Sequence, residues 1–271
     1  MRRLIVRRDG DEVGLDRRPA IQAGPSELVA CVVAAAQVQG APLEYGGLLC
    51  DCGAAFALRV SPVGFRHVEA LTSQLPGLLP ALQMWGFRHA RIGAAPEAPT
   101  AEARPELEAG RAVAVAGCFP EAPWRAGLVV HVGRDGLWTL MDVTGRLHRA
   151  APRATVLVTL GKCDGAMRPA LAARLALWLS ASDDAKETVA AGWRAWLDLL
   201  SRPDTPSPSE IAAHEYLYEV LLDGRTHAAG EVAAASEQDE GVVADWLRVA
   251  AARLEQLVAH LEARRPPLHS P

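Results

Sequence analysis

The feature that most constrains the fold of this chain is a change in the pattern of apolar residues near residue 163. Before this point, apolar runs are short and interrupted by glycine and proline, which is typical of strands and short helices joined by turns. After it, apolar residues recur at spacings of three and four, which predicts helices. A length of 271 residues suits one large or two modest domains. We expect domains at 1–162 and 163–264, and a disordered tail at 265–271.

The first domain is expected to combine helices with an antiparallel sheet. Ser26 is a candidate N-cap for a helix that runs to about Gln39. Strands are predicted at residues 3–8 and 87–92, and four apolar stretches predict further strands at residues 112–119, 127–132, 137–143 and 154–160. Asp135-Gly136 lies between the second and third stretches and is a hairpin turn signal. Because strands joined by hairpins pair antiparallel, this half indicates an α+β fold.

The second domain is expected to be an antiparallel helical bundle. The predicted helices lie at residues 167–179, 184–200, 207–222, 226–236 and 240–264. Ser207 and Glu210 have the spacing of a capping box, which predicts the start of the third helix. Asp223-Gly224-Arg225 is interpreted as a link between the third and fourth helices. The long apolar face of this half makes it the expected surface for a homodimer.

Composition excludes several classes of function. The net charge of -4 gives no reason to expect a nucleic-acid partner. The longest apolar run, residues 28–38, is too short for a membrane span, and no secretion signal is recognisable. Five scattered cysteines, an odd number, suit reduced thiols, so we expect a cytoplasmic protein. Phosphate-binding glycine motifs are absent from the sequence, and we expect neither a cofactor nor a metal ion.

Cys52 is the candidate nucleophile, because it precedes Gly53 and a small-residue run with helical character that extends to about Val60. A helix N-terminus stabilises a thiolate. His131 lies on a predicted strand and could act as the base, and Asp142 on the next strand could orient its imidazole. The competing interpretation is that Cys52 packs as a small apolar residue and His131 merely occupies a strand face. The sequence does not decide between Cys50 and Cys52 as the relevant thiol.

The run Cys50-Asp51-Cys52-Gly53-Ala54-Ala55-Phe56-Ala57-Leu58 resembles the segment around the nucleophile of C39-like, papain-like bacteriocin-leader peptidases. The chain is more similar to the butirosin-biosynthesis-protein-H-like group. That similarity includes residues 43–45, 53–58, 116–121, 127–130, 192–196 and 222–229. The resemblance implies a papain-like N-terminal half of one helix and an antiparallel sheet, with a C-terminal helical bundle.

The same resemblance implies catalytic partners that this chain lacks. In the peptidases a histidine opens the strand that begins here at Gly127, and a glutamine precedes the cysteine where this chain has Gly46. His131 lies further along its strand. We therefore expect a catalytically degenerate papain-like protein that binds a small molecule or peptide. The alternative is a cysteine-dependent acyltransferase or peptidase that uses Cys52, His131 and Asp142 through a thioester.

Overall fold

In the computed structural model of the protein, the described residues are 6–9, 12–15, 18–22, 24–56, 75–94, 99–119, 125–152, 154–165, 185–203 and 205–265. Internal contacts divide the chain into two units. The first contains residues 1–45 and 79–168, and the second contains residues 46–78 and 169–271. A piece of the N-terminal half therefore belongs with the C-terminal helices. The single boundary expected near residue 163 describes only one of the points at which the chain passes between the units.

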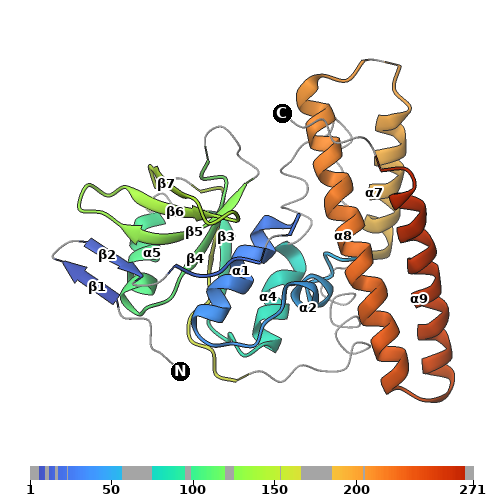
Figure 1. The fold of residues 1–271 in the computed structure, drawn as a ribbon, viewed down its shortest axis with the longest axis horizontal. Helices are drawn as coiled ribbons and strands as arrows, with labels where there is room; N and C mark the ends of the chain where they lie inside the picture. The colour runs from blue at the N-terminus through green and yellow to red at the C-terminus, as the bar shows by residue number, and fades with distance from the viewer. Residues whose placement is uncertain are drawn as a thin grey trace. The chain divides into compact units, whose positions relative to one another are not determined.

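The first unit contains an antiparallel sheet, to which the described residues contribute eight strands (Figure 1). In chain order these are β1 (Val6–Asp9), β2 (Glu12–Leu15), β3 (Arg91–Ala94), β4 (Val113–Ala116), β5 (Ala126–Val132), β6 (Trp138–Asp142), β7 (Leu147–Ala150) and β8 (Val156–Thr159). β6 pairs with β5 along one edge, and β4 and β2 share the other edge. The predicted mixed α+β fold with an antiparallel sheet is confirmed.

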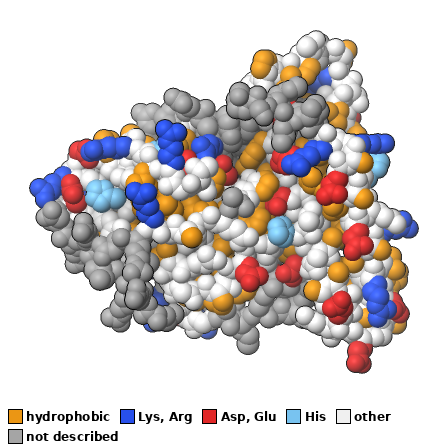
Figure 2. Space-filling view, viewed as in Figure 1, with side chains coloured by type: hydrophobic (Ala, Val, Ile, Leu, Met, Phe, Trp, Pro, Cys, Tyr) orange, Lys and Arg blue, Asp and Glu red, His pale blue; other side chains and the backbone are white. Residues whose placement is uncertain are grey.

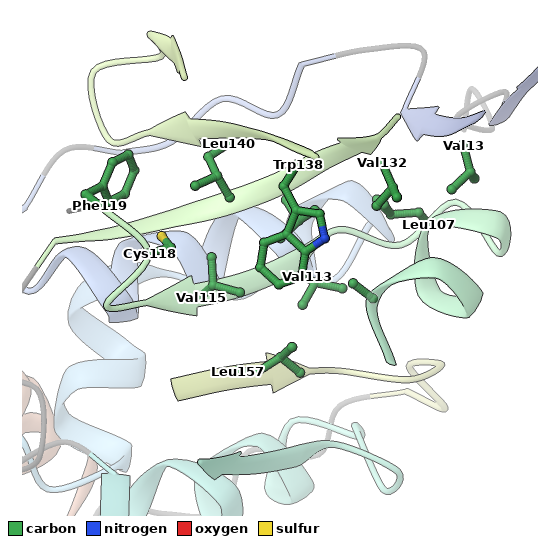
Figure 3. Packing of buried hydrophobic residues seen from close by; sticks show 12 residues of the cluster. Val13, Leu107, Val113, Val115, Cys118, Phe119, Val132, Trp138, Leu140 and Leu157 are labelled. Carbon is green, nitrogen blue, oxygen red and sulfur yellow. The ribbon is translucent and has the colours of Figure 1, made fainter. Parts of the chain in front are cut away.

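One face of the sheet packs against helix α5 (Pro99–Glu108). Val113 and Val115 of β4 point to this face, because side chains two apart on a strand share a side. Trp138 lies at the centre of the cluster, and its indole Nε1 donates a hydrogen bond to Thr100 Oγ1 at 3.1 Å. Figure 3 shows these side chains converging between the strands and α5. This part of the core is therefore built from residues of five strands, β2, β4, β5, β6 and β8, and of one helix, α5.

Helix α1 (Glu27–Val38) contacts β4 and β5. Ala114 and Ala116 alternate with the valines of β4 and point to the opposite face of the sheet, where their small side chains allow a helix to approach closely. Residues 28–36 of α1 are all buried. The predicted start at Ser26 is confirmed, although no cap hydrogen bond from the Ser26 side chain is seen.

Two short strands account for errors in the predicted sheet. The four apolar strands and the hairpin at Asp135-Gly136 are confirmed, with Gly136 at a φ of 75°. β2 and β7 were not predicted. In β7 exposed and half-buried residues alternate, so none of its four residues is buried. A short edge strand of this kind lacks the apolar alternation by which strands are recognised.

The second unit contains most of α2 (Tyr45–Asp51), together with α7 (Ala185–Leu200), α8 (Pro208–Gln238) and α9 (Gly241–Glu262). A further helix, α4 (Leu75–Met84), is shared by the two units along the chain. The predicted capping box is present: Ser207 Oγ accepts from the Glu210 N–H, and the Glu210 side chain accepts from the Ser207 N–H. α8 and α9 run alongside each other in Figure 1.

The predicted break at residues 223–225 is wrong, because α8 is one continuous helix through Gly224. The glycine is explained by close packing, since a Cβ there would lie 3.2 Å from Ala55 Cα. The predicted helix at 167–179 lies outside the described residues, as does the tail beyond Arg265. Arg265 itself pairs with Glu219, with 2.7 Å between Arg265 Nε and Glu219 Oε1.

Candidate functional site

Cys52 does not begin a helix, and this corrects the sequence interpretation. Helix α2 ends at Asp51, and the Cys52 N–H donates to Leu48 O at 2.9 Å as part of the last turn. Gly53 follows with a φ of 75°, the left-handed conformation that commonly terminates helices. The Cys52 thiol therefore lies at the negative end of the helix dipole, where a thiolate is disfavoured. The remainder of the predicted helix, residues 57–60, lies outside the described residues.

Burial also keeps the Cys52 thiol protonated. The residue is 1% exposed, and its Sγ donates to Leu49 O at 3.5 Å. Removal from water raises the pKa of Cys52 to about 12, against a smaller opposing effect of backbone hydrogen bonds. A nucleophilic cysteine requires a lowered pKa and access to substrate. Cys50 is buried as well, so neither of the two candidate thiols has the exposure that a nucleophile needs.

His131 lies in the first unit, on β5, with 37% of its side chain exposed. Its Nε2 is 3.8 Å from Glu12 Oε2, and it lies opposite Gly14 in the neighbouring strand. A Cβ at Gly14 would lie 2.7 Å from His131 Cδ2, so the glycine leaves room for the imidazole. The partner of His131 is therefore an acidic residue of β2.

Asp142 ends β6 and is buried. Its Oδ1 accepts from the N–H groups of Thr144 and Arg146, each at 2.9 Å, and from the Thr144 hydroxyl at 2.6 Å. Its Oδ2 lies 2.8 Å from His148 Nε2. Burial alone would raise the pKa of Asp142, but these hydrogen bonds outweigh burial and hold it at about 2. The carboxylate is thus ionised and fully engaged.

The three predicted site residues do not form one cluster within either unit. Asp142 lies opposite Gly127 in the β5–β6 register, whereas His131 lies opposite Thr139. The imidazole that Asp142 orients is His148 of β7. Cys52 belongs to the second unit, and the other two residues belong to the first.

A different set of residues gathers where the N-terminus of α1 meets the beginning of β5 and the end of β6. We call it the α1–β5 junction: Glu27, Arg125, Ala126, Asp142 and His148. Glu27 Oε2 accepts from the Ala126 N–H at 2.9 Å, and Arg125 Nε lies 3.3 Å from Glu27 Oε1. Arg125 Nη2 is also 3.4 Å from Asp142 Oδ2. One guanidinium therefore bridges two carboxylates that are distant in sequence.

The junction carries two negative charges and one permanent positive charge in a mostly buried setting. Burial raises the pKa of Glu27, while the Ala126 N–H and Arg125 oppose that rise. Phe119 closes one side: the Arg125 guanidinium lies 5.5 Å from its ring centroid, and the His148 ring meets it edge-on at 5.2 Å. Arg125 is thereby held by an aromatic ring as well as by both carboxylates.

Two thiols near the junction are unsuited to nucleophilic chemistry. Cys31 on α1 and Cys118 after β4 are both buried and lie within electrostatic range of Glu27. Burial raises the pKa of Cys118 to about 12 and raises that of Cys31 well above its ordinary value, and Glu27 raises both further. Each thiol is therefore neutral at physiological pH.

The second unit contains a pocket of about 220 Å³. Its lining comes from the end of α7, the following loop and the first turns of α8: Leu199, Leu200, Arg202, Thr205, Pro206, Glu210, Ile211 and His214. The His214 imidazole is held in place by a hydrogen bond, which Trp196 Nε1 donates to His214 Nδ1 at 3.2 Å. Burial lowers the pKa of His214, so its imidazole is neutral at pH 7. The pocket therefore combines an apolar lining with groups of both charges.

Sequence reasoning missed Glu27, Arg125 and His148. A signal was present for Glu27, which follows the predicted N-cap and so had to lie at a helix N-terminus. Arg125 directly precedes a predicted strand, but its carboxylate partners are 98 residues upstream and 17 downstream. His148 was not placed because its strand was not predicted.

Comparison of the chain with protein-family models, with curated proteins and with solved structures finds no match. Among the described helices, none has both the length and the apolar character needed to cross a membrane. Nor do three His, Cys, Asp or Glu side chains in the described part of the chain gather into a group that could hold a metal ion.

Proposed function

We propose that this chain is a papain-like protein that has lost thiol catalysis and binds a small molecule or peptide. The observation that carries the proposal is the α1–β5 junction. In the peptidases that the sequence resembles, a histidine opens the strand equivalent to β5. Here that strand opens with Ala126, and the adjoining helix N-terminus carries Ser26 and Glu27.

At the α1–β5 junction, the N-terminus of α1 is occupied by one of the protein's own carboxylates. A helix N-terminus favours an anion, and Glu27 supplies one in the first turn of α1. That carboxylate accepts from the Ala126 N–H and pairs with Arg125. His148, the imidazole of the junction, is itself held by Asp142. These contacts make a stable polar cluster and leave the junction without an activated nucleophile.

The alternative, an acyltransferase or peptidase that uses Cys52, His131 and Asp142, has weaker support. It requires a thiolate at Cys52, whose pKa burial raises to about 12. It also requires Asp142 to orient His131, whereas the contacts of Asp142 are with Thr144, Arg146, His148 and Arg125.

The pocket beside α7 and α8 is the proposed binding place. Leu199, Pro206 and Ile211 offer apolar contact, and Arg202 and Glu210 bring opposite charges to the same opening. Such a lining suits a small zwitterion with an apolar side chain, including the end of a peptide. The volume of about 220 Å³ limits the ligand to roughly one or two residues in size.

Binding can be followed through the indole N–H signal of Trp196 in heteronuclear NMR spectra, because this group bonds His214 in the pocket wall. Titration with leucine, phenylalanine and their dipeptides should give a saturable shift of that signal, assigned with Trp196→Phe. Ile211→Glu should abolish the shift, and the matched Ile211→Val should retain it. Cys52→Ser should leave it unchanged. The proposal fails if none of these probes produces a saturable shift, or if Cys52→Ser removes it.

A further inference from the structure

We propose that the first half of α9 is an interface through which two copies of this chain associate. Four large apolar residues, which we call the α9 stripe, are exposed there: Val242 by 71%, Val243 by 51%, Trp246 by 71% and Val249 by 55%. Single exposed apolar residues are ordinary, and Figure 2 shows hydrophobic side chains scattered among charged ones over the visible face. A contiguous group that includes a tryptophan, by contrast, indicates an interaction surface. This inference is independent of the proposed ligand pocket.

The α9 stripe is not the face that packs within the molecule. Val242, Trp246 and Val249 are spaced by four and three and so lie along one side of the helix. The inward side carries Leu247, Ala251 and Leu254, which pack with Val232 and Ala235 of α8. α7 packs near the other end of α9, where Trp196 and Leu199 share a cluster with Leu257 and Leu261.

The pattern of residues along α9 suits an antiparallel copy of itself. Val242 and Val249 lie four residues before and three residues after Trp246. A two-fold axis near Trp246 would therefore set each tryptophan beside its equivalent and set Val242 against Val249 of the second copy. Such an interface is self-complementary, as two-fold dimers require.

The charged residues on either side of the α9 stripe also favour an antiparallel pair. Asp239 and Glu240 precede it, and Arg253 follows it on the stripe side of the helix, all of them exposed. At a rise of 1.5 Å per residue, both ends lie about 10 Å from Trp246. An antiparallel pair thus brings each Arg253 to the acidic turn of the other copy, whereas a parallel pair opposes like charges. Because the stripe is short, we expect a dissociation constant on the order of micromolar.

Sedimentation velocity of the full chain across the micromolar range tests the inference. The mass should rise with concentration from 28.9 kDa toward twice that value. Trp246→Glu should weaken association at least about tenfold, since central aromatic residues dominate such interfaces. Ala259→Glu adds the same charge at an exposed position of α9 outside the stripe and should associate normally. Circular dichroism should show both variants to be folded.

A charge exchange tests the antiparallel geometry. Arg253→Glu should weaken association, and the triple change Arg253→Glu, Asp239→Arg and Glu240→Arg should restore it. A wild-type chain that stays monomeric throughout the range would overturn the inference. So would a dimer that is unaffected by Trp246→Glu, or one in which the exchanged charges fail to restore association.

Discussion

At the scale of single residues, the reactivity of Cys52 depends on whether the residue lies at the start or at the end of a helix. The sequence Asp-Cys-Gly is compatible with a helix that starts or one that stops. Gly53 decides the matter, because its φ of 75° terminates α2 and leaves Cys52 in the last turn. The dipole that would lower a thiol pKa at an N-terminus therefore acts in the opposite sense here.

Thiol reactivity should follow burial across the five cysteines. Cys163 is half-buried, and the other four are buried. A pKa of about 12 leaves Cys52 with roughly a thousandfold less thiolate at pH 7.5 than its ordinary pKa would. Iodoacetamide should therefore modify Cys163 first and spare Cys52 up to pH 9, as followed by peptide mapping. In urea, where burial is lost, all five should react alike. Faster labelling of native Cys52 than of Cys163 would contradict the proposed loss of catalysis.

The residues that form the junction were only partly accessible to sequence reasoning. Local patterns place Ser26 and Glu27 at the start of a helix, because capping depends on near neighbours. The bridge made by Arg125 joins Glu27 to Asp142 through the sheet, and no local pattern encodes that contact. Asp142 was predicted to orient His131, but it lies opposite Gly127 in the register of β5 and β6, and the imidazole it contacts is His148.

At the scale of elements, apolar periodicity predicted what is buried better than where elements end. The apolar strands were recognised because tertiary burial and local pattern agree in them. The edge strand β7 has no buried residue, and α8 contains a glycine of the kind that usually interrupts helices. In α8 packing overrides propensity, since Gly224 lets the chain at Ala55 approach the helix backbone.

Two glycines of α8 provide a matched test of that explanation. A Cβ at Gly230 would meet nothing within 4 Å, so Gly230→Ala should raise the free energy of unfolding by about 0.5–1 kcal/mol. At Gly224 the same Cβ would lie 3.2 Å from Ala55 Cα, so Gly224→Ala should lose that gain and destabilise the protein. Urea denaturation followed by circular dichroism compares them. Equal stabilisation by both changes would show that close packing is not the reason for Gly224.

At the scale of the whole molecule, the two units are not successive stretches of chain. Residues 46–78 belong with the C-terminal helices, and a buried arginine is part of that association. The Arg225 guanidinium donates to Ala55 O, and its Nη2 donates to Phe56 O at 2.9 Å. Burial lowers the pKa of Arg225 to about 10. The change in apolar pattern near residue 163 could not reveal that residues 46–78 belong to the second unit, because local periodicity does not depend on which unit a segment joins.

Removal of the Arg225 guanidinium should loosen the second unit selectively. Arg225→Met keeps a long apolar side chain but leaves two carbonyls without their donor, at an expected loss of about 2–3 kcal/mol. Hydrogen exchange measured by mass spectrometry should quicken in residues 46–56 and in α8. Exchange in β4, β5 and β6 should stay slow, because these strands belong to the first unit. Arg248→Met, at an exposed position of α9, serves as the control. Equal loosening of both units would contradict the division.

The contact between Arg225 and Ala55 spans 170 residues, and this separation has a consequence for synthesis on the ribosome. At about 5–20 residues per second, the segment that ends α2 emerges roughly 10–30 s before the helix that will receive it. Throughout that interval the carbonyls of Ala55 and Phe56 lack the guanidinium that donates to them in the folded protein. The first unit, by contrast, has every strand that the structure describes once residue 159 has emerged. The sheet can therefore form first, with the segment around Cys52 as the last piece of the N-terminal half to find its place.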